Sequence, residues 1–160
     1  MSRLPREHFE KLVEQLMRHE GTRRDAKGWH IPYRCSAGAL TIGYGHNLDA
    51  NPLPGMSAAS LLSEEQARNL LAEDIYKQEK HLCRTLAFTR TLDPVRYAVL
   101  VNMCFNLGIG GLLTFRNTLS DISSGEYTAA ARRMLRSRWA SQVGKRAVEL
   151  SRQMDSGVWQ

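Results

Sequence analysis

The sequence predicts an α+β fold, in which a long helix joins a small β-hairpin lobe to a larger all-helical lobe. Apolar residues recur at helical spacing before residue 20 and again after residue 63. Between these regions, glycine and proline punctuate residues 22–55, which contain two short strand-like segments. The 160 residues are 42% hydrophobic and 24% charged, as in a single globular domain. We expect a cleft between the two lobes, because ligand sites favour such boundaries.

The N-terminal segment predicts a helix over residues 5–19. Pro5 suits a first helical position, and Gly21 is a stop signal. The hairpin lobe then covers about residues 20–62, with strands expected at 31–35 and 39–44 and a turn at 36–38. Glu20 should therefore lie at the junction of the two lobes.

Two capping signals predict the next helices. Ser63 and Gln66 form a capping box at the start of the connecting helix, about residues 63–83. Asp93 and Pro94 suit the N-cap and first residue of an apolar helix that should end at Gly108 and form the centre of the core. Further helices are expected at about 116–123, 126–135 and 143–154, so the helical lobe comprises residues 84–160 and the helix at 5–19. No segment is expected to approach membrane-spanning length.

The charge balance favours an anionic partner. The net charge is +6 and the isoelectric point is about 9.5, with the positive excess greatest in residues 125–160. Nucleic acid, anionic lipid and anionic cell-wall polymers all fit this balance, and so does a solvated helical face that only keeps the protein soluble.

The cysteines and the N-terminus predict where the protein is made. Three cysteines without a C-x-x-C spacing imply neither a disulfide framework nor a standard zinc site. The five histidines lack metal-ligand spacing and no phosphate-binding glycine loop is present, so no metal or cofactor is expected. The charged residues 1–11 do not resemble a signal peptide, and we therefore expect a protein that starts in a reducing cytoplasm.

Three chemically useful side chains should gather at the lobe junction. Glu20 ends the first helix, where the helix dipole opposes ionisation, and a protonated carboxyl group there could act as a general acid. Thr41 alternates with the apolar Leu40 and Ile42, so it should point toward the cleft. Cys35 should lie on the neighbouring strand. From position alone, Glu20 could also be an ordinary surface residue, and Cys35 a small buried one.

Most of the chain resembles the phage-type lysozymes, the endolysins of glycoside hydrolase family 24. The segments that carry this resemblance are HEG at 19–21, LTIGYGHNL at 40–48, DPVRYAVLVNMCFNLGIGGL at 93–112, TFRNTL at 114–119, RSRW at 136–139 and GKRA at 144–147. The resemblance implies a lysozyme-like fold with Glu20 as the acid and with Cys35 and Thr41 placing the attacking water. Cys35 stands where the best-known members have Asp, and Asp25 and Asp49 are weaker candidates for that role.

The spacing also departs from the family, because more residues separate Glu20 from Cys35. We expect the extra residues, around 24–32, to loop out ahead of the hairpin. The base or nucleophile role of Cys35 would require activation of the thiol, for which the basic C-terminal region could supply a cation.

The resemblance assigns further residues by position. Phe105, Thr118 and Arg133 match sugar-contacting positions, although Phe105 could equally belong to the core. Arg146 matches an arginine that approaches the catalytic glutamate. The resemblance also implies a structural ion pair between His46 and Asp74, in preference to a role for His46 as the base.

The expected activity is hydrolysis of the β-1,4 bond between N-acetylmuramic acid and N-acetylglucosamine in bacterial peptidoglycan. The resemblance, together with the lack of a signal-like N-terminus, implies a protein that stays in the host cytoplasm until a holin releases it to the periplasm and cell wall, and a monomer is the default expectation. Nucleic-acid binding and stable membrane insertion are not expected. The alternatives are a lytic transglycosylase, which forms 1,6-anhydro ends, and a non-enzymatic cationic protein that binds the wall or the membrane.

Overall fold

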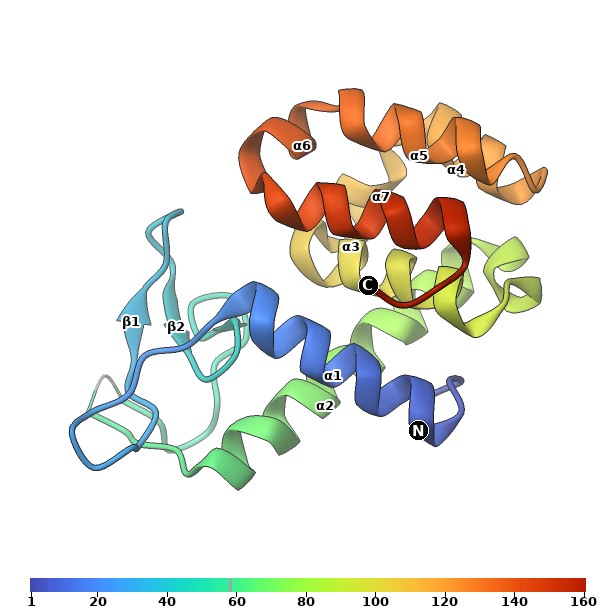
Figure 1. Ribbon diagram of the computed structural model, residues 1–160. Coiled ribbons are helices and arrows are strands. Elements are labelled where there is room, and N and C mark those ends of the chain that lie inside the picture. Colours follow the sequence, from blue (N-terminus) through green and yellow to red (C-terminus); the bar gives the residue numbers. More distant parts are fainter. Residues whose placement is uncertain (58) are drawn as a thin grey trace. The chain divides into compact units, whose positions relative to one another are not determined.

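A computed structural model describes residues 1–57 and 59–160, and it confirms the α+β fold. The chain forms two compact units (Figure 1). The hairpin unit is Glu10–Tyr76, and the helical unit comprises Met1–Phe9 and Lys77–Gln160. In chain order the elements are α1 (Arg6–Glu20), β1 (Tyr33–Arg34), β2 (Leu40–Ile42), β3 (His46–Asn47), α2 (Glu64–Thr85), η1 (Ala87–Thr91), α3 (Pro94–Leu113), α4 (Arg116–Ser123), α5 (Tyr127–Arg136), α6 (Arg138–Val143) and α7 (Lys145–Ser156).

The hairpin unit contains a three-stranded antiparallel sheet in the order β1-β2-β3. Tyr33 lies opposite Thr41, which in turn lies opposite Asn47. The predicted hairpin is confirmed, because the Cys35 amide donates to the Ala39 carbonyl at 3.0 Å across the turn. The sheet thus places Tyr33, Thr41 and Asn47 on one face, since opposed residues of antiparallel strands point to the same side.

The strands are shorter than predicted, and β3 was not predicted. The expectation that the second strand reaches Tyr44 is wrong, because β2 ends at Ile42. Gly43 and Gly45 have φ angles of 60° and 80°, and they form the turn that leads from β2 to β3. These left-handed conformations are readily available only to glycine.

Helix α2 begins as the capping box predicts. The Ser63 amide donates to Gln66 Oε1 at 2.8 Å, and the Gln66 amide donates to Ser63 Oγ at 3.1 Å. Together these bonds satisfy two backbone donors at the helix start.

Helix α3 supplies much of the core of the helical unit. The Asp93 carboxylate accepts a hydrogen bond from the Arg96 amide at 3.0 Å, and Pro94 follows it, as predicted. The residues from Tyr97 to Cys104 are all buried. At Gly108, where the helix was expected to end, the backbone leaves the helical region (φ 70°, ψ 164°), but the chain then resumes a helix that reaches Leu113, so Gly108 kinks α3 and does not end it.

By length and composition alone, α3 could cross a membrane, contrary to the expectation that no segment approaches that length. It has 20 residues and a mean hydropathy of 1.3, and half of its most apolar stretch is buried within the protein. The regular part from Pro94 to Leu107 spans about 21 Å, which is less than the roughly 30 Å of a bilayer core. These properties fit a core helix.

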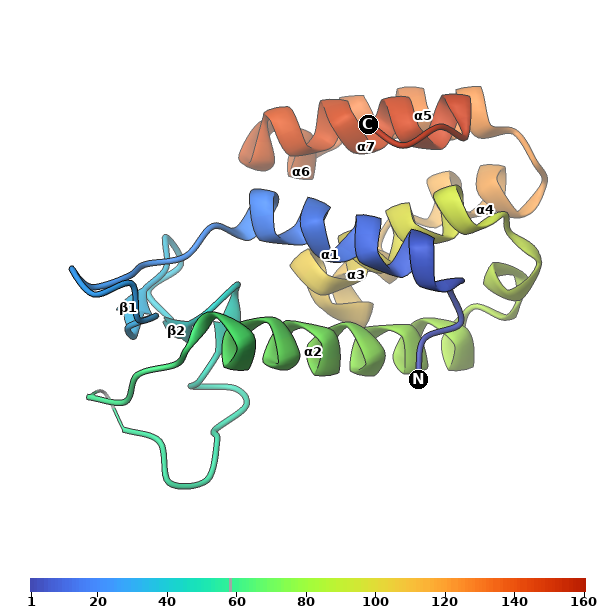
Figure 2. The same ribbon diagram turned by 60° about the horizontal axis from the view of Figure 1, so that its bottom comes forward.

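The remaining helices complete the helical unit, in which α5 and α7 lie side by side (Figures 1 and 2). The 3-10 helix η1 and the six-residue helix α6 were not predicted. Helix α6 is capped by Ser137, whose side chain accepts a hydrogen bond from the Ala140 amide. Gly144, with a φ of 57°, separates α6 from α7.

Candidate active site

The carboxyl group of Glu20 lies against the glycine turn that follows β2. Glu20 is the last residue of α1, and Gly21 beyond it has a φ of 63°. A Cβ atom built on Gly45 would lie 2.9 Å from Glu20 Oε2 and 3.0 Å from its Cδ. A side chain at position 45 would therefore displace the carboxyl group, and the glycine leaves the space that Glu20 occupies.

The phenol of Tyr33, which lies opposite Thr41 in the sheet, is affected by the charges of both Glu20 and Cys35. Burial raises the pKa of Tyr33, and the negative charges of Glu20 and Cys35 add to this effect, while Arg23 opposes it. Both groups must therefore lie within electrostatic range of the same phenol. Tyr33 was not predicted as a site residue, although its place two residues before Cys35 in a strand could have indicated it.

The Cys35 thiol lies in a ring of hydrogen-bond donors made by the hairpin turn. The Ala37 amide is the largest cause that lowers its pKa, and the Ala39 amide and the Thr41 hydroxyl lower it further, although desolvation opposes them. Thr41 is buried, and its hydroxyl also lies 3.0 Å from the Ala39 carbonyl. Because the hydroxyl has one proton, it can donate to this carbonyl or to the thiolate, but not to both fully.

The donors that activate Cys35 therefore differ from the expected ones. The sequence suggested a cation from the basic C-terminal region, whereas the largest effects come from amides and a hydroxyl of the hairpin itself. Donors to the charged form stabilise it as a nearby cation would. The hairpin's own donors thus lower the pKa of Cys35.

His46 is buried and bridges two acceptors. Its Nδ1 lies 2.6 Å from Asp74 Oδ2, and its Nε2 lies 2.9 Å from the Asn51 carbonyl. A carboxylate and a carbonyl both accept, so each ring nitrogen is assigned a proton. The structure thus places His46 and Asp74 as an ion pair between β3 and α2, an arrangement that leaves neither nitrogen available as a base.

A second polar cluster anchors the residues between α1 and β1. The buried His30 bonds Thr22 Oγ1 at 2.7 Å and Glu64 Oε2 at 2.8 Å, while Arg24 bonds Glu64 at 2.6 Å. Burial opposes ionisation of Glu64, but hydrogen bonds from Tyr44, His30 and Arg24 outweigh it and lower the pKa of Glu64 to about 2. Burial and Glu64 in turn raise the pKa of Tyr44 to about 12. The cluster ties this loop to the start of α2.

Two aspartates near the hairpin have structural partners. Asp25 Oδ1 accepts from the backbone amides of Lys27 and Trp29, and Asp49 Oδ2 accepts from the Leu40 amide at 2.9 Å. These bonds shape a turn and an end of the sheet. Across residues 1–57 and 59–160, no group of three or more His, Cys, Asp or Glu side chains is placed to hold a metal ion.

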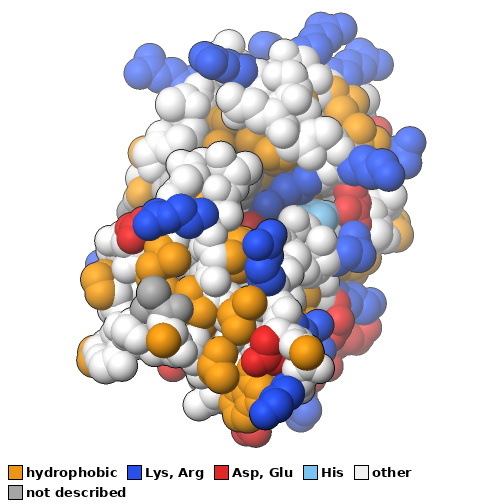
Figure 3. All heavy atoms as spheres, turned by 90° about the vertical axis from the view of Figure 1, so that its left-hand side faces the viewer, with side chains coloured by type: hydrophobic (Ala, Val, Ile, Leu, Met, Phe, Trp, Pro, Cys, Tyr) orange, Lys and Arg blue, Asp and Glu red, His pale blue; other side chains and the backbone are white. Residues whose placement is uncertain are grey.

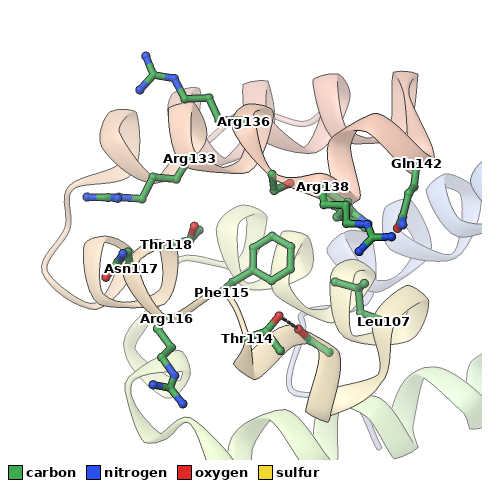
Figure 4. Close-up of a pocket in the computed structure, with 13 residues that line it drawn as sticks. Leu107, Thr114, Phe115, Arg116, Asn117, Thr118, Arg133, Arg136, Arg138 and Gln142 are labelled. Carbon is green, nitrogen blue, oxygen red and sulfur yellow. Dashed lines mark hydrogen bonds between the residues drawn. The ribbon is translucent and has the colours of Figure 1, made fainter.

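The helical unit contains a pocket of about 710 Å³ between α3, α4, α5 and α6 (Figure 4). Figure 4 shows the Phe115 ring in the middle of this pocket. The Trp139 ring lies edge-on to it, with 6.0 Å between the two ring centroids. Thr118 and Arg133 line this pocket, whereas Phe105 is not among its lining residues. Arg133 also bonds Asp121 at 2.6 Å. The arginines of its rim are Arg116, Arg133, Arg136 and Arg138.

Arg146 is buried in the helical unit. Its Nε and Nη2 atoms donate to Asn102 Oδ1 at 3.0 and 2.8 Å. Asn102 was not predicted as a partner, because its position in an apolar helix gave no signal for it. Arg146 and Glu20 belong to different units, and their proximity stays a prediction.

The fold and the candidate site are those of a lysozyme-like glycosidase: a small sheet, a largely helical remainder, and a glutamate, a thiol and a hydroxyl that lie at β2 and at the two turns that flank it. The chain belongs to the phage lysozyme family, which matches residues 17–155. It is 28% identical over 137 residues to an endolysin of Acyrthosiphon pisum secondary endosymbiont phage 1, covering 86% of this chain and 84% of that protein. It is also 29% identical over 69 residues to a probable T4-type lysozyme 1 of Dictyostelium discoideum, covering 43% and 41% of the two chains. Membership of the family makes the protein a glycosidase-type peptidoglycan hydrolase.

Proposed function

We propose that the protein is a muramidase that hydrolyses the β-1,4 bond between N-acetylmuramic acid and N-acetylglucosamine. The observation that carries this proposal is the fit of the Glu20 carboxyl group against Gly45, in the turn that follows the strand carrying Thr41. In this mechanism Glu20 is the general acid and protonates the glycosidic oxygen as the bond breaks.

Cys35 and Thr41 then direct water to the anomeric carbon. As a thiolate, Cys35 accepts a proton from the water while the Thr41 hydroxyl orients it, and the resulting hydroxide attacks the sugar. If Cys35 itself attacks instead, a glycosyl thioether forms and water releases it in a second step. The first route inverts and the second retains the configuration of the anomeric carbon.

The positive charge suits a polymer rich in carboxylates. The net charge of +6 and the arginines at the rim of the helical unit's pocket attract the anionic wall and raise the local concentration of enzyme there. The similarity to a phage endolysin supports a role in host lysis. In this proposal a monomeric enzyme waits in the host cytoplasm, a holin opens the membrane, and the enzyme then degrades the wall from the periplasm.

Mass spectrometry of the products from purified Gram-negative peptidoglycan tests the proposal, with the Glu20→Gln variant beside the wild type. The expected products are muropeptides with free reducing N-acetylmuramic acid ends, and the variant should fold but yield none. An active Glu20→Gln protein would remove Glu20 from its role. Anhydro ends would identify a lytic transglycosylase, and no soluble product from either protein would favour a cationic binding protein.

A further inference from the structure

The extra residues between α1 and β1 form an ordered loop closed by backbone bonds. Arg24 pairs with His30, and His30 pairs with Leu62. The Ile31 amide also donates to the Arg23 carbonyl at 3.0 Å. Residues 23–25, 29–31 and 61–63 therefore run beside one another as short extended segments.

The two faces of this loop differ in character. Arg24 and His30 direct their side chains to Glu64. Since side chains alternate along extended chain, Trp29 and Ile31 point to the opposite face. The Arg23 guanidinium lies 5.8 Å from the Tyr33 ring centroid, which places Arg23 on this second face together with Tyr33. We call Trp29, Ile31 and Tyr33 the apolar stripe.

Trp29 is exposed, yet its backbone is held firmly. Trp29 is 41% exposed, and Leu61, which lies beside Ile31, is 46% exposed. The Trp29 amide donates to Asp25 Oδ1 at 3.0 Å, and its carbonyl accepts from the Asp25 amide at 2.9 Å. Figure 3 shows hydrophobic side chains and Lys or Arg exposed together on the side of the molecule that carries β1. Exposed apolar patches bordered by polar groups are typical of ligand sites.

We propose that the apolar stripe is an extended subsite, which binds the glycan strand beyond the bond that is cut. The inference rests on the proposed muramidase function and adds Trp29 as a residue that determines the preferred substrate length. Sugar rings present C–H faces that pack on aromatic rings such as those of Trp29 and Tyr33.

Continuity with the hairpin site supports a glycan as the occupant. The stripe leads along the chain to Cys35, two residues beyond Tyr33, and the segment from Trp29 to Cys35 spans about 20 Å if fully extended. A strand bound at Cys35 could therefore reach Trp29 only if it extends over several sugars. The polar cluster around His30 and Glu64 fixes the backbone of this segment on its other face. The Trp29 ring therefore needs little ordering when the ligand binds.

Calorimetric titration with glycan strands tests this subsite. The probe is peptidoglycan stripped of its stem peptides by an amidase and fractionated into strands of one disaccharide and of four disaccharides. All proteins carry Glu20→Gln so that the strands stay intact. We expect Trp29→Ala to weaken binding of the four-disaccharide strand about tenfold and to leave binding of the single disaccharide unchanged. Trp29→Phe should retain most of the affinity, and the control Val158→Ala, at a residue 61% exposed in the helical unit, should bind as the parent does.

The outcomes separate this inference from the function on which it rests. Equal affinities of the parent and Trp29→Ala for the long strand, or an equal loss for both strand lengths, would overturn the subsite. Thermal unfolding checks each variant, and Trp29→Leu, which keeps apolar bulk but no ring, should bind as weakly as Trp29→Ala. A parent that binds no strand also overturns the subsite. Release of reducing ends by the wild type decides the muramidase function separately.

Discussion

Replacing Gly45 with alanine tests the link between the glycine turn and the proposed acid. The new Cβ would lie 2.9 Å from Glu20 Oε2, whereas ordinary contacts begin at 3.4 Å. The Glu20 carboxyl group must therefore move by about 0.5 Å. The backbone at position 45 also has a φ of +80°, which an L side chain adopts at a cost of about 1–2 kcal/mol.

The size of the effect follows from these two changes. A displacement of about 1 Å in catalytic geometry can lower a rate about 100-fold, so a shift of half that size predicts a loss in kcat of about tenfold. The strain alone should lower the melting temperature by roughly 2–8 °C. Stability and activity thus fall together in Gly45→Ala, and a control is needed to separate them.

Gly43→Ala is that control, because it carries the same kind of strain without the collision. Its φ is +60°, and the nearest atom to its new Cβ is Ala67 Cβ at 3.5 Å, an ordinary contact. We expect Gly43→Ala to lose stability but to keep kcat within about twofold of the wild type. Initial rates of reducing-end release, measured well below both melting temperatures, compare the two variants. Equal kcat values for Gly43→Ala and Gly45→Ala would refute the reasoning.

Three further outcomes are expected. The pKa of Glu64 is lowered from 4.5 to about 2, so its charge stabilises the fold above pH 4.5 and this contribution disappears as the pH falls toward 2. Glu64→Gln should therefore lower the free energy of unfolding by about 1 kcal/mol at pH 7, after solvent screening, and by almost nothing at pH 2. Thermal melts measure the difference, and a difference that does not change with pH would contradict this expectation. Hydrogen-bond donors lower the pKa of Cys35, whereas burial raises the pKa of Cys104 to about 11. Iodoacetamide should therefore alkylate Cys35 well before Cys104, and peptide mapping measures both rates. Similar rates would disprove the assignment of a lowered pKa to Cys35. Asp93→Ala should lower the free energy of unfolding in urea by about 1 kcal/mol through loss of the N-cap, with kcat unchanged, and no change in stability would show that the cap contributes nothing.

Elements whose signals are local could be predicted from the sequence. Helix α1, the capping box of α2 and the Asp93 cap of α3 each depend on residues within one turn of the helix start or end. The break at Gly108 was equally readable, although the helix resumes beyond it, because only glycine adopts its backbone angles readily. In these cases propensity and tertiary packing favour the same conformation.

Short elements could not be predicted, because packing rather than local preference decides them. Strand β3 has two residues and forms only because it pairs with β2, and α6 has six residues between two polar segments. Side-chain partners between elements were hidden for the same reason. Asn102 lies in the apolar helix α3 and Arg146 lies in α7, and the sequence gave no sign that they bond.

The closure of the loop explains how a longer spacer is compatible with the family's site. The Ile31 amide bonds the Arg23 carbonyl, so residues 24–30 leave and return to nearly the same point of the backbone. The chain that enters β1 therefore continues almost as if Arg23 were followed directly by Ile31. Glu20 and Cys35 can then keep their relation to Tyr33, on whose pKa both act, whatever the length of the loop. On this argument, an added loop need not disturb the hairpin provided that its ends are bonded together, and its exposed tip is then available for contacts that the shorter spacer could not provide.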